Sequence, residues 1–217
     1  MKRALVVLVG FMLLAGCATA PREKSGFLGE YFQKLEPGPE GGAKMRWINP
    51  GVDHLKYKKF MVDYVVFSLA DDSEYKGING DEMKQLGDAA SLAFVNALKE
   101  RYPVVSEPGP DVARLKLAII GLKQSRPVLS AVTTVVPVGL AVSVVRRGAT
   151  GAWTGSGATQ VEFMALDSMT NEVLGAAYDE YKAGFTERFS KWGAAEEAFK
   201  YWGEKFAKYL DDLYGKK

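Results

Sequence analysis

The residues with the clearest chemical role lie near the start of the chain, where residues 14–17 read Leu-Ala-Gly-Cys. Cys17 is the only cysteine among the 217 residues. It follows a basic start at residues 2–3 (Lys-Arg) and an apolar stretch over residues 4–14, a pattern typical of a secretory leader. Small residues directly before a cysteine are what a lipoprotein signal peptidase requires. We therefore expect cleavage after Gly16 and a diacylglyceryl thioether on the sulfur of Cys17.

The apolar leader is too short to be a transmembrane helix. Residues 4–15 fall well below the roughly 20 apolar residues that cross a hydrocarbon core. Several acyl chains at Cys17, palmitate among them, would anchor the protein to a membrane without spanning it. The alternative is an ordinary secretory leader in which Cys17 is incidental. An aspartate after the cysteine retains Gram-negative lipoproteins at the inner membrane, so Ala18 favours the outer membrane, facing the periplasm.

Few other residues suggest chemistry. His54 is the only histidine, which excludes a metal site built on several histidines and leaves little basis for a histidine triad. Two carboxylate clusters, at residues 71–74 and 179–187, lack the spacing of a calcium loop and are interpreted as solvated strand ends. The sequence therefore predicts no catalytic residue, no metal, no cofactor and no enzymatic activity, with a hydrolase as a distant alternative.

The charge balance also excludes a class of partner. The chain has 28 basic and 26 acidic residues, and cleavage would remove Lys2 and Arg3, which leaves 26 of each sign. A protein that binds nucleic acid usually has a basic excess, so no nucleic-acid partner is expected. Acylation of Cys17 would leave no thiol, and hence no disulfide framework.

Hydrophobic patterning predicts the fold. The expected elements are a central strand at residues 60–69, a helix at 82–101 capped by Asp81, a strand at 114–123, a hairpin of 159–166 with 172–182, and a helix at 191–214. The fold class is therefore α/β (α+β): a two-layer sandwich with a mostly antiparallel sheet and both helices on one face. The apolar stripe of the last helix is also compatible with a short coiled-coil seam, but a core helix fits better because the sheet needs cover.

The predicted organisation is a signal peptide at residues 1–16, a lipidated tether at 17–25 and one domain at 26–217. The apolar residues Phe27, Leu28, Tyr31 and Phe32 are too few to fold alone, so we expect them to lie across the domain and pack into it.

An apolar insertion at residues 127–148 does not fit this scheme. Residues 128–145 carry no charge, and Arg126, Arg146 and Arg147 flank them. One interpretation is a pair of buried strands that turn at residues 137–139; the other is an exposed loop that contacts lipid, an apolar ligand or another subunit. The contact residues under the second interpretation are Val128, Leu129, Val135, Val136, Val138, Leu140 and Val144.

The sequence also resembles a known family over nearly all of the mature chain. The residues that carry this resemblance are 25–28 (Ser-Gly-Phe-Leu), Tyr31, Leu35, 46–50 (Arg-Trp-Ile-Asn-Pro) and 57–63, together with 154–157 and 167–174 later in the chain. They resemble the DUF3313 family of bacterial lipoproteins of unknown function. The resemblance implies a lipoprotein at the periplasm or outer membrane, and it brings no activity and no catalytic residue.

Two functional hypotheses follow. The leading hypothesis is a non-enzymatic envelope accessory or scaffold, held at the membrane through Cys17, that docks a protein partner or self-associates as a homo-oligomer. The alternative is a periplasmic binding module for a lipid or apolar ligand.

Overall fold

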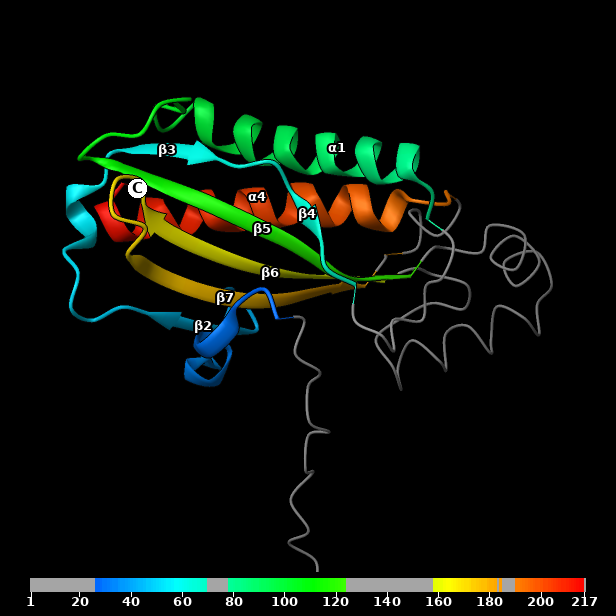
Figure 1. The fold of residues 1–217 in the computed structure, drawn as a ribbon, viewed down its shortest axis with the longest axis horizontal. Helices are drawn as coiled ribbons and strands as arrows, with labels where there is room; N and C mark the ends of the chain where they lie inside the picture. Colours follow the sequence, from blue (N-terminus) through cyan, green and yellow to red (C-terminus); the bar gives the residue numbers. More distant parts are fainter. Residues whose placement is uncertain (1–25, 70–77, 124–157, 183, 185–189, 217) are drawn as a thin grey trace, which may run out of the picture.

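A computed structural model describes residues 26–69, 78–123, 158–182, 184 and 190–216 (Figure 1). Seven strands form one mixed sheet in the order β1-β2-β7-β6-β5-β3, and β4 also pairs with β5. Strands β3 and β4 run parallel to β5, whereas the other pairs are antiparallel. The strands are β1 (Glu36–Pro37), β2 (Met45–Ile48), β3 (Lys59–Val62), β4 (Val66–Phe67), β5 (Val112–Lys123), β6 (Ala158–Asp167) and β7 (Val173–Lys182).

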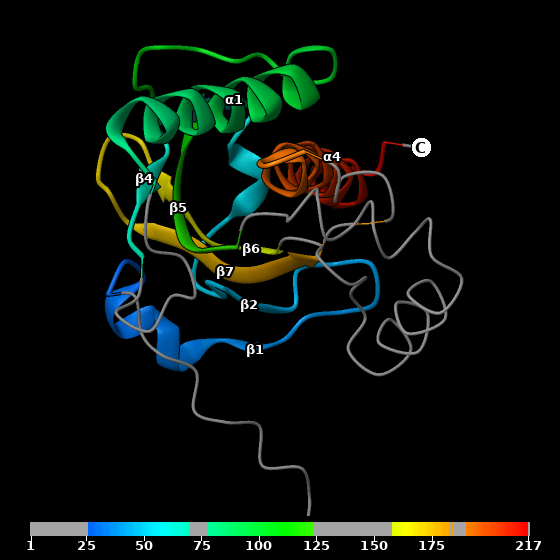
Figure 2. The ribbon, with the colours of Figure 1, turned by 90° about the vertical axis from the view of Figure 1, so that its right-hand side faces the viewer.

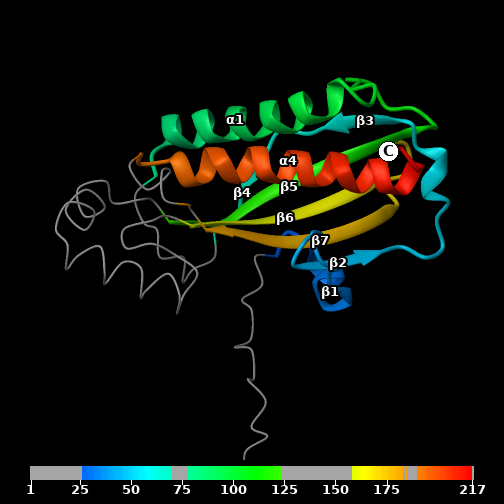
Figure 3. The ribbon, with the colours of Figure 1, turned by 180° about the vertical axis from the view of Figure 1, so that it is seen from behind.

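Two long helices cover one face of this sheet. They are α1 (Gly80–Lys99) and α4 (Gly193–Tyr214), which lie side by side on the same face in both side views (Figures 1 and 3). The end-on view separates the helical layer from the sheet layer (Figure 2). The predicted α/β class, with two helices on one face of a largely antiparallel sheet, is confirmed.

The core between the two layers follows the alternation of the strands. Leu115, Leu117 and Ile119 of β5 face the helices, as their period of two predicts. Val161 of β6 belongs to the same cluster, and Phe163 packs against it. From α4, Phe199 and Trp202 fill the space between these strands and α1. Burial of these large apolar side chains is the main force that holds the helices on the sheet.

The N-terminal segment covers the opposite face of the sheet. A short 3-10 helix, η1 (Gly29–Lys34), precedes β1, and both lie on the side away from the long helices (Figure 2). Leu28 is buried, and the ring of Tyr31 lies 5.2 Å from that of Trp47. The expectation that these residues pack onto the domain holds for Leu28 and Tyr31.

The structure differs in two respects from the single central strand predicted at residues 60–69. The strand is split into β3 and β4, and it lies at an edge of the sheet instead of the centre. The interruption includes Asp63, whose carboxylate pairs with Arg114 at 2.8 Å. Phe60 is nevertheless buried, because residues 103–105 bond to its outer side and the core packs over it. This cover explains why an edge strand has the composition of a central one.

Helix α1 begins two residues before the predicted start. Its cap is Asn79, whose side chain accepts a hydrogen bond from the backbone of Glu82 while the Glu82 carboxylate accepts one from the backbone of Asn79. This reciprocal capping box stabilises the first turn, and it replaces the predicted cap at Asp81. The last helix and the hairpin lie within two residues of their predicted bounds.

Some predictions fall outside the described residues, among them the leader, Cys17 and the apolar insertion at 127–148. None of the helices in the described ranges is both long and apolar enough to cross a bilayer.

Candidate functional site

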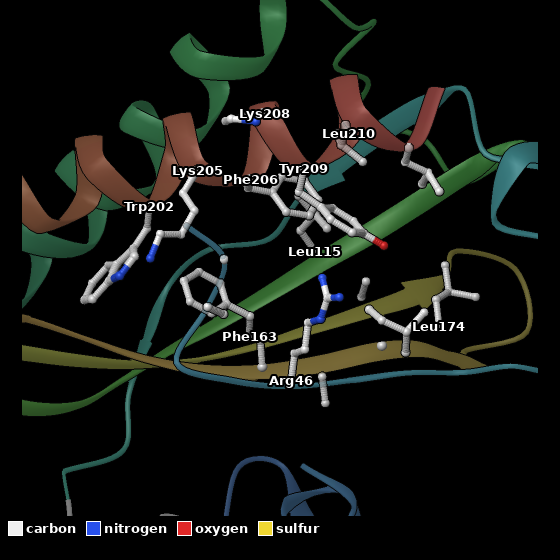
Figure 4. A pocket seen from close by; sticks show the side chains of 18 of the residues that line it. Arg46, Leu115, Phe163, Leu174, Trp202, Lys205, Phe206, Lys208, Tyr209 and Leu210 are labelled. Atoms are coloured by element: carbon white, nitrogen blue, oxygen red, sulfur yellow. The ribbon is translucent and has the colours of Figure 1, made fainter. Parts of the chain in front are cut away.

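A cavity of about 250 Å³ lies between α4 and the helix-facing side of the sheet. We call it the α4–sheet cavity. Its walls come from β2, β5, β6 and β7 below, α4 above, and the loop between β1 and β2 (Figure 4). The apolar part of the lining includes Ile48, Leu115, Phe163, Leu174, Phe206, Tyr209 and Leu213.

The packing of the two helices explains why space remains at this place. Six strands about 4.8 Å apart make a sheet wider than two helices of about 10 Å diameter can cover. Gly203 lets α4 approach α1 closely, since a Cβ there would lie 3.1 Å from the Ala93 carbonyl oxygen and 3.2 Å from the Ala97 Cβ. Below α4, two of the β7 residues that line the cavity are small, Gly175 and Ala177, and larger side chains there would occupy part of the space.

A buried polar cluster closes one end of the cavity. The Asp179 carboxylate on β7 accepts hydrogen bonds from Trp202 Nε1 at 3.1 Å and Lys205 Nζ at 2.8 Å. It also accepts one from the backbone of Lys44 at 3.3 Å. Burial alone would lower the pKa of Lys205, but the bonds and charge of Asp179 outweigh it, so the pKa is raised. Lys205 therefore stays protonated, and its charge is already neutralised.

The prediction that the carboxylates near residue 179 are solvated strand ends is wrong for Asp179. Its side chain is 6% exposed, and its partner Lys205 is 16% exposed. The register pairs Asp179 with Val161, a core position on the helix-facing side. A carboxylate at an inward-facing strand position was the signal that sequence reasoning missed.

Arg46 is the second polar feature of the cavity, and sequence reasoning did not single it out. It stands on β2 opposite Ala177, and Figure 4 shows its side chain pointing from the sheet toward Tyr209 of α4. Burial raises the pKa of Tyr209, and the positive charge of Arg46 opposes that rise. The signal in the sequence is a single cation between the apolar residues of a short strand.

The described part of the chain gives the Arg46 guanidinium no hydrogen bond and no ion pair. The other two arginines that the structure describes are both paired. Arg114 bonds to Asp63 at 2.8 Å, and Arg101 bonds to Glu204 at 3.0 Å and to Asp211 at 3.1 Å. Arg46 thus differs from them in presenting its donors to a cavity.

His54 lies at the edge of the cavity in a short 3-10 helix, η2 (His54–Lys56). Its Nε2 is 2.8 Å from the Asn49 carbonyl oxygen, so the ring is held by the backbone. Across the described residues, no three histidine, cysteine, aspartate or glutamate side chains are grouped to hold a metal ion.

The site residues proposed from the sequence all fall in parts of the chain that the structure does not describe. Cys17 lies outside the described residues, and so do Val128, Leu129, Val135, Val136, Val138, Leu140 and Val144.

Comparison with known proteins identifies the family. The model of the family described as "Protein of unknown function (DUF3313)" matches residues 23–206. The chain belongs to the DUF3313 family. No curated protein matches this DUF3313 chain.

The solved structures to which this DUF3313 chain is similar are distant from it. The PelC dodecamer from Paraburkholderia phytofirmans is 12% identical, with a TM-score of 0.42, over 74% of this chain and 94% of that one. Protein XCC0632 from Xanthomonas campestris, of the family DUF330, is 8% identical with a TM-score of 0.36, over 75% and 88%. Hypothetical protein CT253 from Chlamydia trachomatis is 8% identical with a TM-score of 0.32, over 72% and 93%.

Proposed function

We propose that this DUF3313 protein is a non-enzymatic binding module that holds an apolar ligand in the α4–sheet cavity. In this proposal it is anchored through Cys17 to the outer membrane and faces the periplasm. The observation that carries the proposal is the cavity itself, about 250 Å³ with a mainly apolar lining. Ligand sites are typically concave and apolar, with a few polar groups that orient the ligand.

The size of the cavity supports a ligand over an ordinary packing defect. Protein interiors pack densely, and voids much larger than a water molecule are few. An apolar cavity of roughly 150 Å³ already admits benzene. The α4–sheet cavity, at about 250 Å³, is larger than that.

An uncharged fluorescent probe tests this proposal. The full chain carrying Cys17→Ser, which lacks the acylation site, is purified without detergent and titrated with N-phenyl-1-naphthylamine. We expect saturable binding with enhanced fluorescence. Ala177→Phe places a ring in the cavity and should abolish binding, while the exposed Leu92→Phe should leave it unchanged. Equal binding by the wild-type chain and Ala177→Phe, with both folded by circular dichroism, would contradict the proposal.

A second candidate function is docking of an envelope partner or self-association. The observation that favours it is strand β4, which within the described residues pairs with β5 alone and bears the exposed Val66 (46%). Tyr64, two residues before Val66, is also exposed (57%). An edge strand with exposed apolar residues is a template for pairing with another chain. In intact envelopes, a photocrosslinker at Val66 or at Val138 of the apolar insertion should give a discrete protein adduct. Adducts to lipid alone, or none, would contradict docking.

A further inference from the structure

The positively charged side chains that line the α4–sheet cavity differ in whether they have an acidic partner. Of the cations that line it, Lys205 pairs with Asp179 at 2.8 Å and Lys208 pairs with Asp212 at 2.9 Å. Lys116 and Arg46 have no acidic partner in the part of the chain that the structure describes. Lys116 lies between the helix-facing Leu115 and Leu117 on β5, so its side chain points to the opposite face of the sheet, whereas Arg46 points into the cavity. A partly buried guanidinium without an acceptor loses hydration that nothing replaces, so an anion from outside would stabilise it.

The acidic groups of the lining do not offer a matching site for a cation. Asp179 and Asp212 are engaged by Lys205 and Lys208, as above. Glu40, in the loop between β1 and β2, is exposed to solvent, where a carboxylate needs no partner. The unsatisfied group within the cavity is therefore positive, and this sets the sign of the ligand.

The volume sets the size of the apolar part. The α4–sheet cavity measures about 250 Å³, more than the roughly 150 Å³ of an apolar cavity that admits benzene. Sites for drug-sized molecules span about 300–1,000 Å³. One acyl chain of medium length fits this space, and a phospholipid with two long chains does not.

We propose that the α4–sheet cavity takes a single-chain amphiphile with an anionic head, whose chain lies against the apolar lining and whose head pairs with Arg46. This inference depends on the proposed function, because it names the ligand of the same cavity. The five N–H donors of a guanidinium match the oxygens of a carboxylate or a phosphate in a planar fork. Both heads share this chemistry, and a free fatty acid or a monoacyl phosphate would supply it.

Displacement of the fluorescent probe tests the head group. The Cys17→Ser chain, loaded with N-phenyl-1-naphthylamine, is titrated with laurate, dodecyl phosphate or dodecanol, which share a chain and differ in the head. We expect the wild-type cavity to bind at least one of the two anions with about tenfold or higher affinity than dodecanol. A hydrogen bond to a charged group contributes a free energy of that size. If laurate binds more tightly than dodecyl phosphate, the ligand is a fatty acid. If dodecyl phosphate binds more tightly, the ligand is a monoacyl phosphate.

Substitutions at Arg46 locate the effect. Arg46→Leu should lower the affinity for the preferred anion by about tenfold and leave the affinity for dodecanol unchanged. Arg46→Lys should restore part of the lost affinity. Lys200→Leu removes a charge from α4 outside the cavity lining and should change the affinity for neither the anion nor dodecanol. If the wild-type chain binds all three amphiphiles equally, or if Lys200→Leu weakens the anion as much as Arg46→Leu, the inference is wrong. Probe binding itself would persist in either case, so the proposed function is judged separately.

Discussion

The indole nitrogen of Trp202 donates a hydrogen bond to the Asp179 carboxylate at 3.1 Å, which ties α4 to β7 at one end of the α4–sheet cavity. Lys205, one turn further along α4, bonds to the same carboxylate oxygen. A single acidic group thus holds two residues of the helix over the sheet. The position of α4, and with it the height of the cavity, depends on this contact.

Loss of the Asp179 charge should destabilise the fold. Asp179→Asn keeps the shape of the side chain but leaves the ammonium group of Lys205 partly buried without a counter-ion, at a cost of about 3 kcal/mol in the free energy of unfolding. Urea denaturation followed by circular dichroism measures this. The control is Asp88→Asn, which breaks the exposed pair with Lys84 and should cost less than about 1 kcal/mol. Equal losses in the two variants would show that the buried cluster contributes no more to the free energy of unfolding than an exposed ion pair does.

The close approach of the two helices predicts a second effect on stability. Gly203→Val introduces a branched side chain against Ala93 and Ala97 and should cost about 1–3 kcal/mol through overpacking. Gly80→Ala, at the first residue of α1, meets no atom within 4 Å and should cause no loss. Thermal denaturation compares the two. A Gly203→Val protein as stable as the wild type would mean that α4 can move away from α1 freely.

Asp167 predicts how stability depends on pH. Burial alone would raise the pKa of its carboxyl, but the backbone N–H groups of Thr170 and Met169 and the side chains of Lys56 and Tyr57 outweigh burial and hold the pKa well below its usual range. A carboxyl whose pKa is lower in the folded state stabilises the fold fully above its unfolded pKa of about 3.9. That stabilisation is lost as the pH falls from there through the folded pKa.

Asp167→Asn should therefore reduce the free energy of unfolding at neutral pH, by about 1–3 kcal/mol for the lost charged hydrogen bonds. The difference from the wild type should shrink as the pH falls below about 4. Urea denaturation at a series of pH values measures both. A difference that stays constant down to acidic pH would mean that the Asp167 charge contributes nothing to stability.

The leader predicts where the protein resides. Cys17→Ser removes the only thiol, so the protein should move from the membrane fraction to the soluble fraction and should no longer incorporate labelled palmitate. Ala20→Ser, three residues further on, serves as the control and should stay with the membrane and keep its label. Membrane association of Cys17→Ser would point to an anchor other than the acyl chains.

Much of the fold could be predicted because its signals are local. The alternation of Leu115, Leu117 and Ile119 predicts which side of β5 is buried, since successive side chains in a strand point to opposite faces. The three- and four-residue spacing of Phe199, Trp202 and Phe206 likewise predicts the buried side of α4. The place of β3 at the edge could not be predicted, because cover by residues 103–105 gives Phe60 the burial of a central strand.

The order of the residues was enough to indicate the family and the two-layer class. The single cysteine after a short apolar leader was enough for the hypothesis of a lipid anchor. The candidate site, in contrast, became visible only once the helices and strands were packed together. Arg46 and Tyr209 are far apart in the chain and meet because β2 pairs with β7 beneath α4. The strand alternation places Asp179 on the inward-facing side, but its partners Trp202 and Lys205 come from another element. Periodicity reports which face of an element is apolar, whereas a cavity depends on how far apart two packed elements come to rest.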